Sequence, residues 1–280
     1  MSKSSSHYVD CVDREIHVTE WGAGRAEKIV MWHGLARTGR DFDALARHLA
    51  DRYHIIAPDT LGRGLSQWAK DSKTQYSYAF YRKIAETLVD KFFGAAPFHW
   101  VGTSMGGLFG IIIAADAFKG RIRRLVINDI GPVLPKAAVD RILTYASKPP
   151  VMDSMQQVEA AFRTIYKPFG HLTDAEWRLM AETGYRRLDD GRYTLHYDPR
   201  MTEHFVYHAG EFEQWDAYDR IACPVLLLRG VETDVLPQAT ADEMVRRGPK
   251  ATLVEFSGIG HAPALNVPEQ IGLIEKFLAA

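Results

Sequence analysis

The sequence has little cysteine and no long apolar run, and each absence excludes a class of protein. Only Cys11 and Cys223 occur. They lie in separate segments without metal-ligand spacing, so we expect neither a disulfide framework nor a cysteine metal site. No stretch approaches the roughly 20 apolar residues that span a bilayer, and the polar segment from Met1 to Ser6 lacks the apolar core of a secretory signal. We therefore expect a cytoplasmic protein.

The sequence also lacks an excess of charge of either sign. The chain has 34 Lys and Arg residues and 35 Asp and Glu residues, so no overall electrostatic field attracts nucleic acid or an anionic membrane. Apolar residues make up 46% of the 280 residues, which is typical of a globular chain long enough to bury a sizeable core. We expect a monomer or homodimer that binds a small-molecule substrate and needs no cofactor, no nucleic acid and no membrane.

Strand-like runs alternate with helical ones along most of the chain. This order predicts an α/β fold in which helices cover both faces of a mostly parallel central sheet. We expect an opening hairpin at 8–21 and further strands at 28–31, 53–57, 98–101, 125–128, 225–228 and 252–256. Helical patterns occupy about 40–51, 75–93, 105–118, 238–247 and 268–279. Several of the strands are continuous apolar runs, which indicates burial on both faces.

The alternation of strands and helices stops after Asp129. Residues 132–215 show no convincing strand, but they contain helix-capping patterns at 154–157 and 173–176 and a helix stop at Gly184. We predict a helical cap over 132–215, inserted after the sixth strand. Residues 1–131 and 216–280 then form the core domain.

The strongest local motif is Gly-Thr-Ser-Met-Gly-Gly at residues 102–107, between a strand-like run and an apolar helical run. This is a G-x-S-x-G motif in the strand, turn and helix context of a nucleophile elbow. The tight turn strains the backbone of the serine, and the glycines two residues before and after it let neighbouring chains pass closely. A helix N-terminus also favours developing negative charge. Ser104 is therefore the candidate nucleophile.

A serine nucleophile needs a base that is itself oriented by a third group. Among 11 histidines, His261 lies in a glycine-rich turn after the last predicted strand and before the last helix. This position brings it to the same carboxyl edge of the sheet as Ser104. Two carboxylates, Asp234 and Asp129, follow strands that end at this edge, and either satisfies the geometry. Glu232 is a third, lesser candidate.

With these motifs the chain resembles the capped α/β-hydrolases, a superfamily of serine hydrolases that includes esterases, lactonases and carbon–carbon hydrolases. The resemblance implies a Ser-His-Asp triad. In this family the acid usually follows the penultimate strand, which favours Asp234. A minority of members place the acid on the strand before the cap, which corresponds to Asp129.

Two further loops are similar to loops of this family. Residues 32–35, Trp-His-Gly-Leu, resemble its His-Gly loop. The resemblance implies that the backbone N–H of Leu35 joins that of Met105, the residue after the nucleophile, in an oxyanion hole. His33 is then a scaffold residue. Residues 59–66 resemble the Asp-x-x-Gly-x-Gly-x-Ser loop, in which we expect Asp59 to bind backbone groups and to take no part in chemistry.

A metal site and a substrate pocket find less support in the sequence. His204 and His208 are four residues apart, but no third ligand is evident and the glutamate of H-E-x-x-H is missing, so we predict no metal. Aromatic and cationic side chains of the cap are candidates to line a pocket. No specific substrate-binding residue is predicted, because such side chains more often form the cap's own core and surface.

These observations predict a serine hydrolase that cleaves a small carboxylic ester or lactone through an acyl-enzyme intermediate. One alternative is a carbon–carbon bond (diketone) or amide hydrolase on the same triad. Carbon–carbon hydrolases of the family often carry tryptophan directly after the base histidine, where this chain has Ala262. An alternative of another class is a hydrolase-like sensor that binds a small molecule and signals to a partner.

Overall fold

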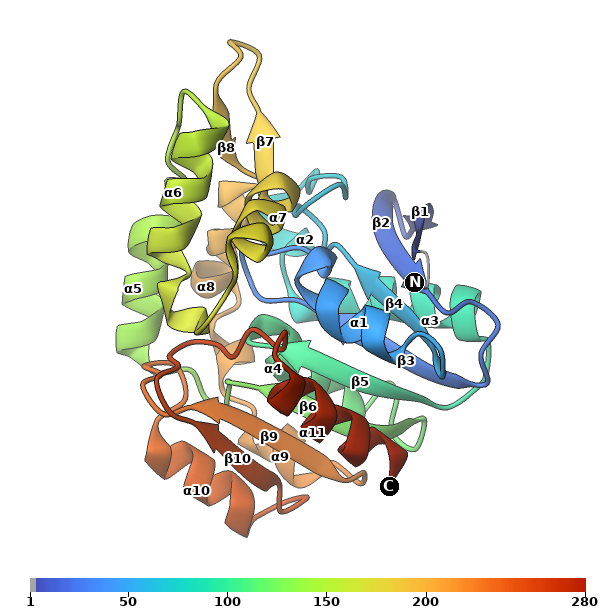
Figure 1. The fold of residues 1–280 in the computed structure, drawn as a ribbon. Helices are drawn as coiled ribbons and strands as arrows, with labels where there is room; N and C mark the ends of the chain where they lie inside the picture. The colour runs from blue at the N-terminus through green and yellow to red at the C-terminus, as the bar shows by residue number, and fades with distance from the viewer. Residues whose placement is uncertain (1–3) are drawn as a thin grey trace.

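One sheet of eight strands organises the chain, as the computed structural model shows for residues 4–280 (Figure 1). The strands are β1 Ser4–Cys11, β2 Arg14–Trp21, β3 Glu27–Trp32, β4 Tyr53–Pro58, β5 Phe98–Thr103, β6 Ile122–Asn128, β9 Val225–Gly230 and β10 Thr252–Phe256. They lie in the order β1-β2-β4-β3-β5-β6-β9-β10. Only the β1–β2 and β2–β4 pairs are antiparallel. The predicted α/β class with a mostly parallel sheet is confirmed.

Helices cover both faces of this sheet, and each face has its own apolar core. Along β3 the side chains alternate, so Ile29 and Met31 join one core while Val30 and Trp32 join the other. The first core includes residues of α1 Asp43–Leu49 and α11 Pro268–Ala279. The second includes residues of α3 Tyr78–Phe93, α4 Met105–Ala115, α9 Trp215–Asp219 and α10 Gln238–Arg246. All residues of β4 and β9 are buried, as their largely apolar sequences indicate.

Two of the predicted helices are divided in the structure. The segment expected as one helix over 75–93 forms α2 Ser72–Gln75 and α3, because Ser77 has extended backbone and its side chain caps α3 by accepting from the N–H of Phe80. The segment expected over 40–51 opens with a 3₁₀ turn, η1 Gly39–Phe42, before α1 begins.

The segment between β6 and β9 is mainly helical and gathers on one side of the molecule (Figure 1). We call residues 132–215 the insertion. It contains α5 Lys136–Ala146, α6 Met155–Ile165, α7 Asp174–Gly184, α8 His204–Tyr207 and the 3₁₀ turns η2 Lys167–Phe169, η3 Pro199–Glu203 and η4 Ala209–Phe212. Thr173 and Glu176 form the expected capping box of α7, and Ser154 caps α6. The helical insertion after the sixth strand is thus present.

The expectation that the insertion holds no strand is wrong. A short hairpin pairs β7 Tyr185–Arg187 with β8 Tyr193–Leu195. Its strands are too short to show the alternation of apolar and polar residues that marks a strand in a sequence. The turn closes through a hydrogen bond from the N–H of Leu188 to the carbonyl of Arg192, and Gly191 supplies a φ of 87°.

Candidate active site

Ser104 occupies the sharp turn between β5 and α4, with φ 52° and ψ −118°. The structure explains the glycines around it. A Cβ on Gly102 would lie 2.1 Å from the carbonyl oxygen of Gly106, and a Cβ on Gly106 would lie 2.0 Å from the carbonyl oxygen of Trp32. Any larger residue at either position would collide with backbone. The predicted strand, turn and helix are all present, and they hold the serine in a backbone conformation that L-residues rarely adopt.

His261, in the loop between β10 and α11, links Ser104 to a buried carboxylate. Its Nε2 lies 2.7 Å from Oγ of Ser104, and its Nδ1 lies 2.8 Å from Oδ2 of Asp129. Because an ionised carboxylate only accepts hydrogen bonds, Nδ1–H donates to Asp129 and Nε2 accepts the hydroxyl of Ser104. The other oxygen of Asp129 accepts the N–H of Gly230 at 2.9 Å. The three side chains form one hydrogen-bonded chain.

Asp234, which the sequence favoured as the partner of His261, does not contact it. The carboxylate of Asp234 pairs instead with Arg141 of α5, with Oδ1 3.0 Å from Nη2, and both side chains are about half exposed. In the sheet, β6 lies directly between β5 and β9. Asp129 therefore follows the strand next to that of Ser104, whereas Asp234 lies four residues beyond the end of β9, where the loop turns toward the insertion. Glu232 also lies in this loop, and within residues 4–280 its side chain forms no hydrogen bond with His261.

Ser104 and His261 open into a cavity of about 490 Å³ between the core and the insertion. The insertion supplies a largely apolar and aromatic wall: Ile142, Tyr145, Ile165, Tyr166, Pro168 and Phe169. Asp234, Glu232 and Arg141 line the same cavity. A cavity of this size with an apolar wall and polar groups opposite it suits a small organic molecule.

The loop after β3 brings Leu35 to this cavity, and Met105 begins α4 directly after Ser104. The carbonyl of Leu35 is fixed by Nε of Arg63 at 2.8 Å. His33 is fully buried. Its Nδ1 lies 2.6 Å from the carbonyl of Gly34, and its Nε2 accepts the N–H of Thr60. Burial lowers the pKa of His33 to about 4, so the ring is neutral at pH 7 and serves to hold the loop.

The comparisons with known proteins show the family of this chain. Residues 29–271 match the model of the alpha/beta hydrolase family. The chain belongs to this family. It is 36% identical over 272 residues to the 3-hydroxybutyrate-oligomer hydrolase of Cupriavidus necator, covering 92% of this chain and 90% of that protein. It is 25% identical over 257 residues to the 2-(acetamidomethylene)succinate hydrolase of Mesorhizobium japonicum, covering 91% and 88%. The crystal structure of an alpha/beta hydrolase from Novosphingobium aromaticivorans matches with a TM-score of 0.88 and 30% identity over 100% of this chain and 99% of that one.

One cavity residue of this alpha/beta hydrolase was missed by the sequence analysis. Arg37 is buried and pairs with Asp41, with Nη2 2.6 Å from Oδ1 and Nε 2.9 Å from Oδ2. Its guanidinium also lies over the rings of Tyr166, at 4.4 Å, and Phe162, at 5.2 Å. Burial lowers the pKa of Arg37, but the carboxylate of Asp41 outweighs this and holds the pKa above its ordinary value. Arg37 thus fastens α6 to the core with a permanent charge. A lone arginine carries no sequence pattern that could have revealed this.

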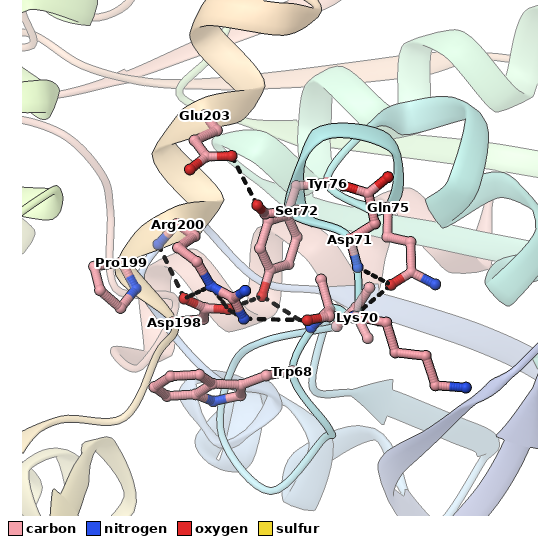
Figure 2. A network of polar contacts seen from close by, with 12 residues as sticks. Trp68, Lys70, Asp71, Ser72, Gln75, Tyr76, Asp198, Pro199, Arg200 and Glu203 are labelled. Atoms are coloured by element: carbon pink, nitrogen blue, oxygen red, sulfur yellow. Dashed lines mark hydrogen bonds and ion pairs between the residues drawn. The ribbon is translucent and has the colours of Figure 1, made fainter.

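A second polar network ties the insertion to α2 and to the residue that follows it (Figure 2). Asp198 is fully buried and accepts the hydroxyl of Tyr76 at 2.6 Å and Nη2 of Arg200 at 2.7 Å. Nearby, Ser72 donates its hydroxyl to Glu203 at 2.7 Å. These bonds fix η3 against the core (Figure 2).

The loop after β4 contains Asp59, and the expected contacts of its side chain with backbone groups are confirmed. Its carboxylate accepts the N–H groups of Gly39 at 2.8 Å and Leu65 at 2.9 Å. His204 and His208 also have protein partners, namely Glu211 and the carbonyl of Lys73. Across residues 4–280, no three His, Cys, Asp or Glu side chains gather in a way that would hold a metal ion. Within the same range no helix has the length and apolar character needed to cross a membrane.

Proposed function

We propose that this chain is a serine hydrolase of small carboxylic esters, in which Ser104 is the nucleophile, His261 the general base and Asp129 the acid that orients His261. The hydrogen-bonded chain from Ser104 through His261 to Asp129, opening into a cavity, carries this proposal. A neutral imidazole whose Nδ1–H is held by a buried carboxylate presents its free lone pair to the serine hydroxyl.

The reaction follows from these positions. Oγ of Ser104 attacks the ester carbonyl carbon while its proton passes to Nε2 of His261, and Asp129 stabilises the resulting imidazolium. The N–H groups of Leu35 and Met105 hold the oxyanion. His261 then returns the proton to the departing alkoxide, which leaves Ser104 acylated. Water, deprotonated by His261, attacks the acyl group and restores the enzyme.

For the substrate we propose a short linear ester of a hydroxy acid, such as a dimer or trimer of 3-hydroxybutyrate. The 36% identity to the oligomer hydrolase of Cupriavidus necator spans nearly the whole of both proteins. The cavity of about 490 Å³ has room for a short oligomer, and the apolar wall from the insertion suits its methyl-bearing backbone. The insertion then acts as a cap that shields the acyl enzyme from bulk water.

The test measures hydrolysis of p-nitrophenyl butyrate and of the 3-hydroxybutyrate dimer by the purified protein. We expect turnover of both esters and its loss in Ser104→Ala, with a fluorophosphonate probe labelling Ser104 alone under brief exposure. Ser257→Ala is the matched control, because Ser257 is an exposed serine in the turn after β10. Binding of the dimer without turnover of any ester would support the sensor alternative instead.

A further inference from the structure

A second serine, histidine and aspartate form a hydrogen-bonded chain far along the sheet from Ser104. Oγ of Ser6, on β1, lies 2.7 Å from Nε2 of His17, on β2. Nδ1 of His17 lies 2.9 Å from Oδ2 of Asp59 in the loop after β4. Each ring nitrogen has the same kind of partner as in His261: Nδ1 faces the carboxylate and Nε2 faces the hydroxyl.

The buried carboxylate of Asp59 sets the hydrogen-bond directions in this second chain. His17 is 3% and Asp59 2% exposed, whereas Ser6 is exposed. Burial raises the pKa of Asp59. The hydrogen bond from His17 and other nearby groups lower it by more, so the pKa lies below its ordinary value. The carboxylate is therefore ionised and holds the proton of His17 on Nδ1. Nε2 is left to accept the hydroxyl proton of Ser6.

These residues line a cavity of about 490 Å³ between the core and the β7 side of the insertion. Thr38 lies in its wall, and the hydroxyl of this buried residue has no hydrogen-bond partner among residues 4–280. A buried hydroxyl without a partner is costly, but this one is closed off from the cavity. Arg186 and Arg187 of β7 add positive charge to the same cavity.

We propose that Ser6 is a second nucleophilic serine, which accepts an acyl group from small activated carboxylic esters. Oγ of Ser6 forms a bond to the carbonyl carbon and passes its proton to Nε2 of His17. The bond between that carbon and the leaving oxygen breaks, and the leaving group takes the proton from His17. The products are acyl-Ser6 and the free alcohol, so no further reactant is needed.

The surroundings of Ser6 also set the expected rate. Ser6 lies in regular strand opposite Thr19, so it has neither the strained turn nor the helix N-terminus that Ser104 has. The loss of one oxyanion donor lowers a rate by about 10²–10³-fold, and we expect Ser6 to be acylated at least that much more slowly than Ser104. Without backbone donors the acyl group is also removed slowly. The site therefore accumulates a stable adduct rather than turning over.

The experiment uses full-length Ser104→Ala protein and p-nitrophenyl acetate, with acetylated residues identified by peptide mapping. Ser4 and Ser5 are matched internal controls, because they are exposed serines on the same strand and have no hydrogen bond to a histidine ring within the described residues. We expect acetylation of Ser6 at least about tenfold above that of Ser4 and Ser5. Equal acetylation of the three serines, or none at Ser6, overturns the proposal.

Two variants in the Ser104→Ala background test the mechanism. His17→Gln removes the base, and we expect acetylation of Ser6 to fall to the level of Ser4 and Ser5. Because His17 is buried, its replacement also disturbs packing, so thermal unfolding is measured alongside. Thr38→Val is the control, because it removes a hydroxyl that is closed off from the cavity, and we expect it to leave the acetylation of Ser6 unchanged. Selectivity for Ser6 that survives His17→Gln overturns the proposal.

Discussion

Oδ2 of Asp129 lies 2.8 Å from Nδ1 of His261, although 132 positions separate the two residues along the chain. The parallel sheet brings them together, because Asp129 follows β6 and His261 follows β10. Only β9 lies between these two strands, and all three end at the same edge. Asp129 is fully buried and has a φ of 59°, a conformation that aspartate adopts more readily than most residues. Oδ1 of the same carboxylate accepts a hydrogen bond from the N–H of Gly230.

Asp129→Asn is therefore expected to lower kcat for p-nitrophenyl butyrate by about four orders of magnitude, because an amide favours the wrong tautomer of His261. Asp234→Asn is the matched control, since it changes a carboxylate of the same cavity that pairs with Arg141. We expect its kcat to stay within about tenfold of the unchanged protein. A larger loss in Asp234→Asn than in Asp129→Asn would contradict the assignment.

Gly106→Ala is expected to destabilise the fold by more than about 3 kcal/mol, because its Cβ would lie 2.0 Å from the backbone oxygen of Trp32. Urea unfolding measures the change. Gly272→Ala serves as the control, since Gly272 is exposed in α11 and no atom lies within 4 Å of the added Cβ. That substitution is expected to stabilise the protein by roughly 0.5–1 kcal/mol. Similar effects at the two positions would show that close approach at the elbow is not what requires glycine.

Stability is expected to fall as the pH drops from about 6.5 toward 4. Burial lowers the pKa values of His33 and His99 from 6.5 to about 4. In this range the unfolded chain binds protons at both rings while the folded chain does not, so the free energy of unfolding decreases with decreasing pH. His99→Leu is expected to make this decrease shallower. Urea titrations at several pH values measure the slope, and an unchanged slope in the variant would exclude His99 as a source.

Arg37→Met is expected to destabilise the protein by about 3–5 kcal/mol, because it leaves Asp41 unpaired and removes the contacts with Phe162 and Tyr166. The matched control is Arg163→Met, which breaks a more exposed pair with Glu159 and is expected to destabilise the protein much less. Chemical unfolding distinguishes the two. Equal losses would mean that burial of Arg37 does not set the strength of its pair.

Much of the fold could be predicted because its signals are local. Continuous apolar runs mark strands buried on both faces, and the motif around Ser104 combines glycines with a strand and a helix that are readable in sequence. The position of His261 follows from its place after the last strand. Each of these inferences needs only a short window of residues.

The features that were missed depend on how distant segments meet. Asp129 and Asp234 both follow strands, and only the order of strands and the path of the loop after β9 decide which one reaches His261. Arg37 packs against the rings of Phe162 in α6 and of Tyr166 directly after it, which lie far from Arg37 in the sequence. The chain from Ser6 to Asp59 joins three segments that share no motif.

Two of the attachments of the insertion differ in their exposure to water, and so in their response to ionic strength. Asp198 is fully buried where it accepts the hydroxyl of Tyr76, whereas Arg141 and Asp234 are about half exposed. Dissolved ions screen exposed pairs and have little effect on buried ones. Added salt should therefore speed amide hydrogen exchange in α5 and leave exchange in η3 unchanged, so the insertion loosens from one end while the other stays in place.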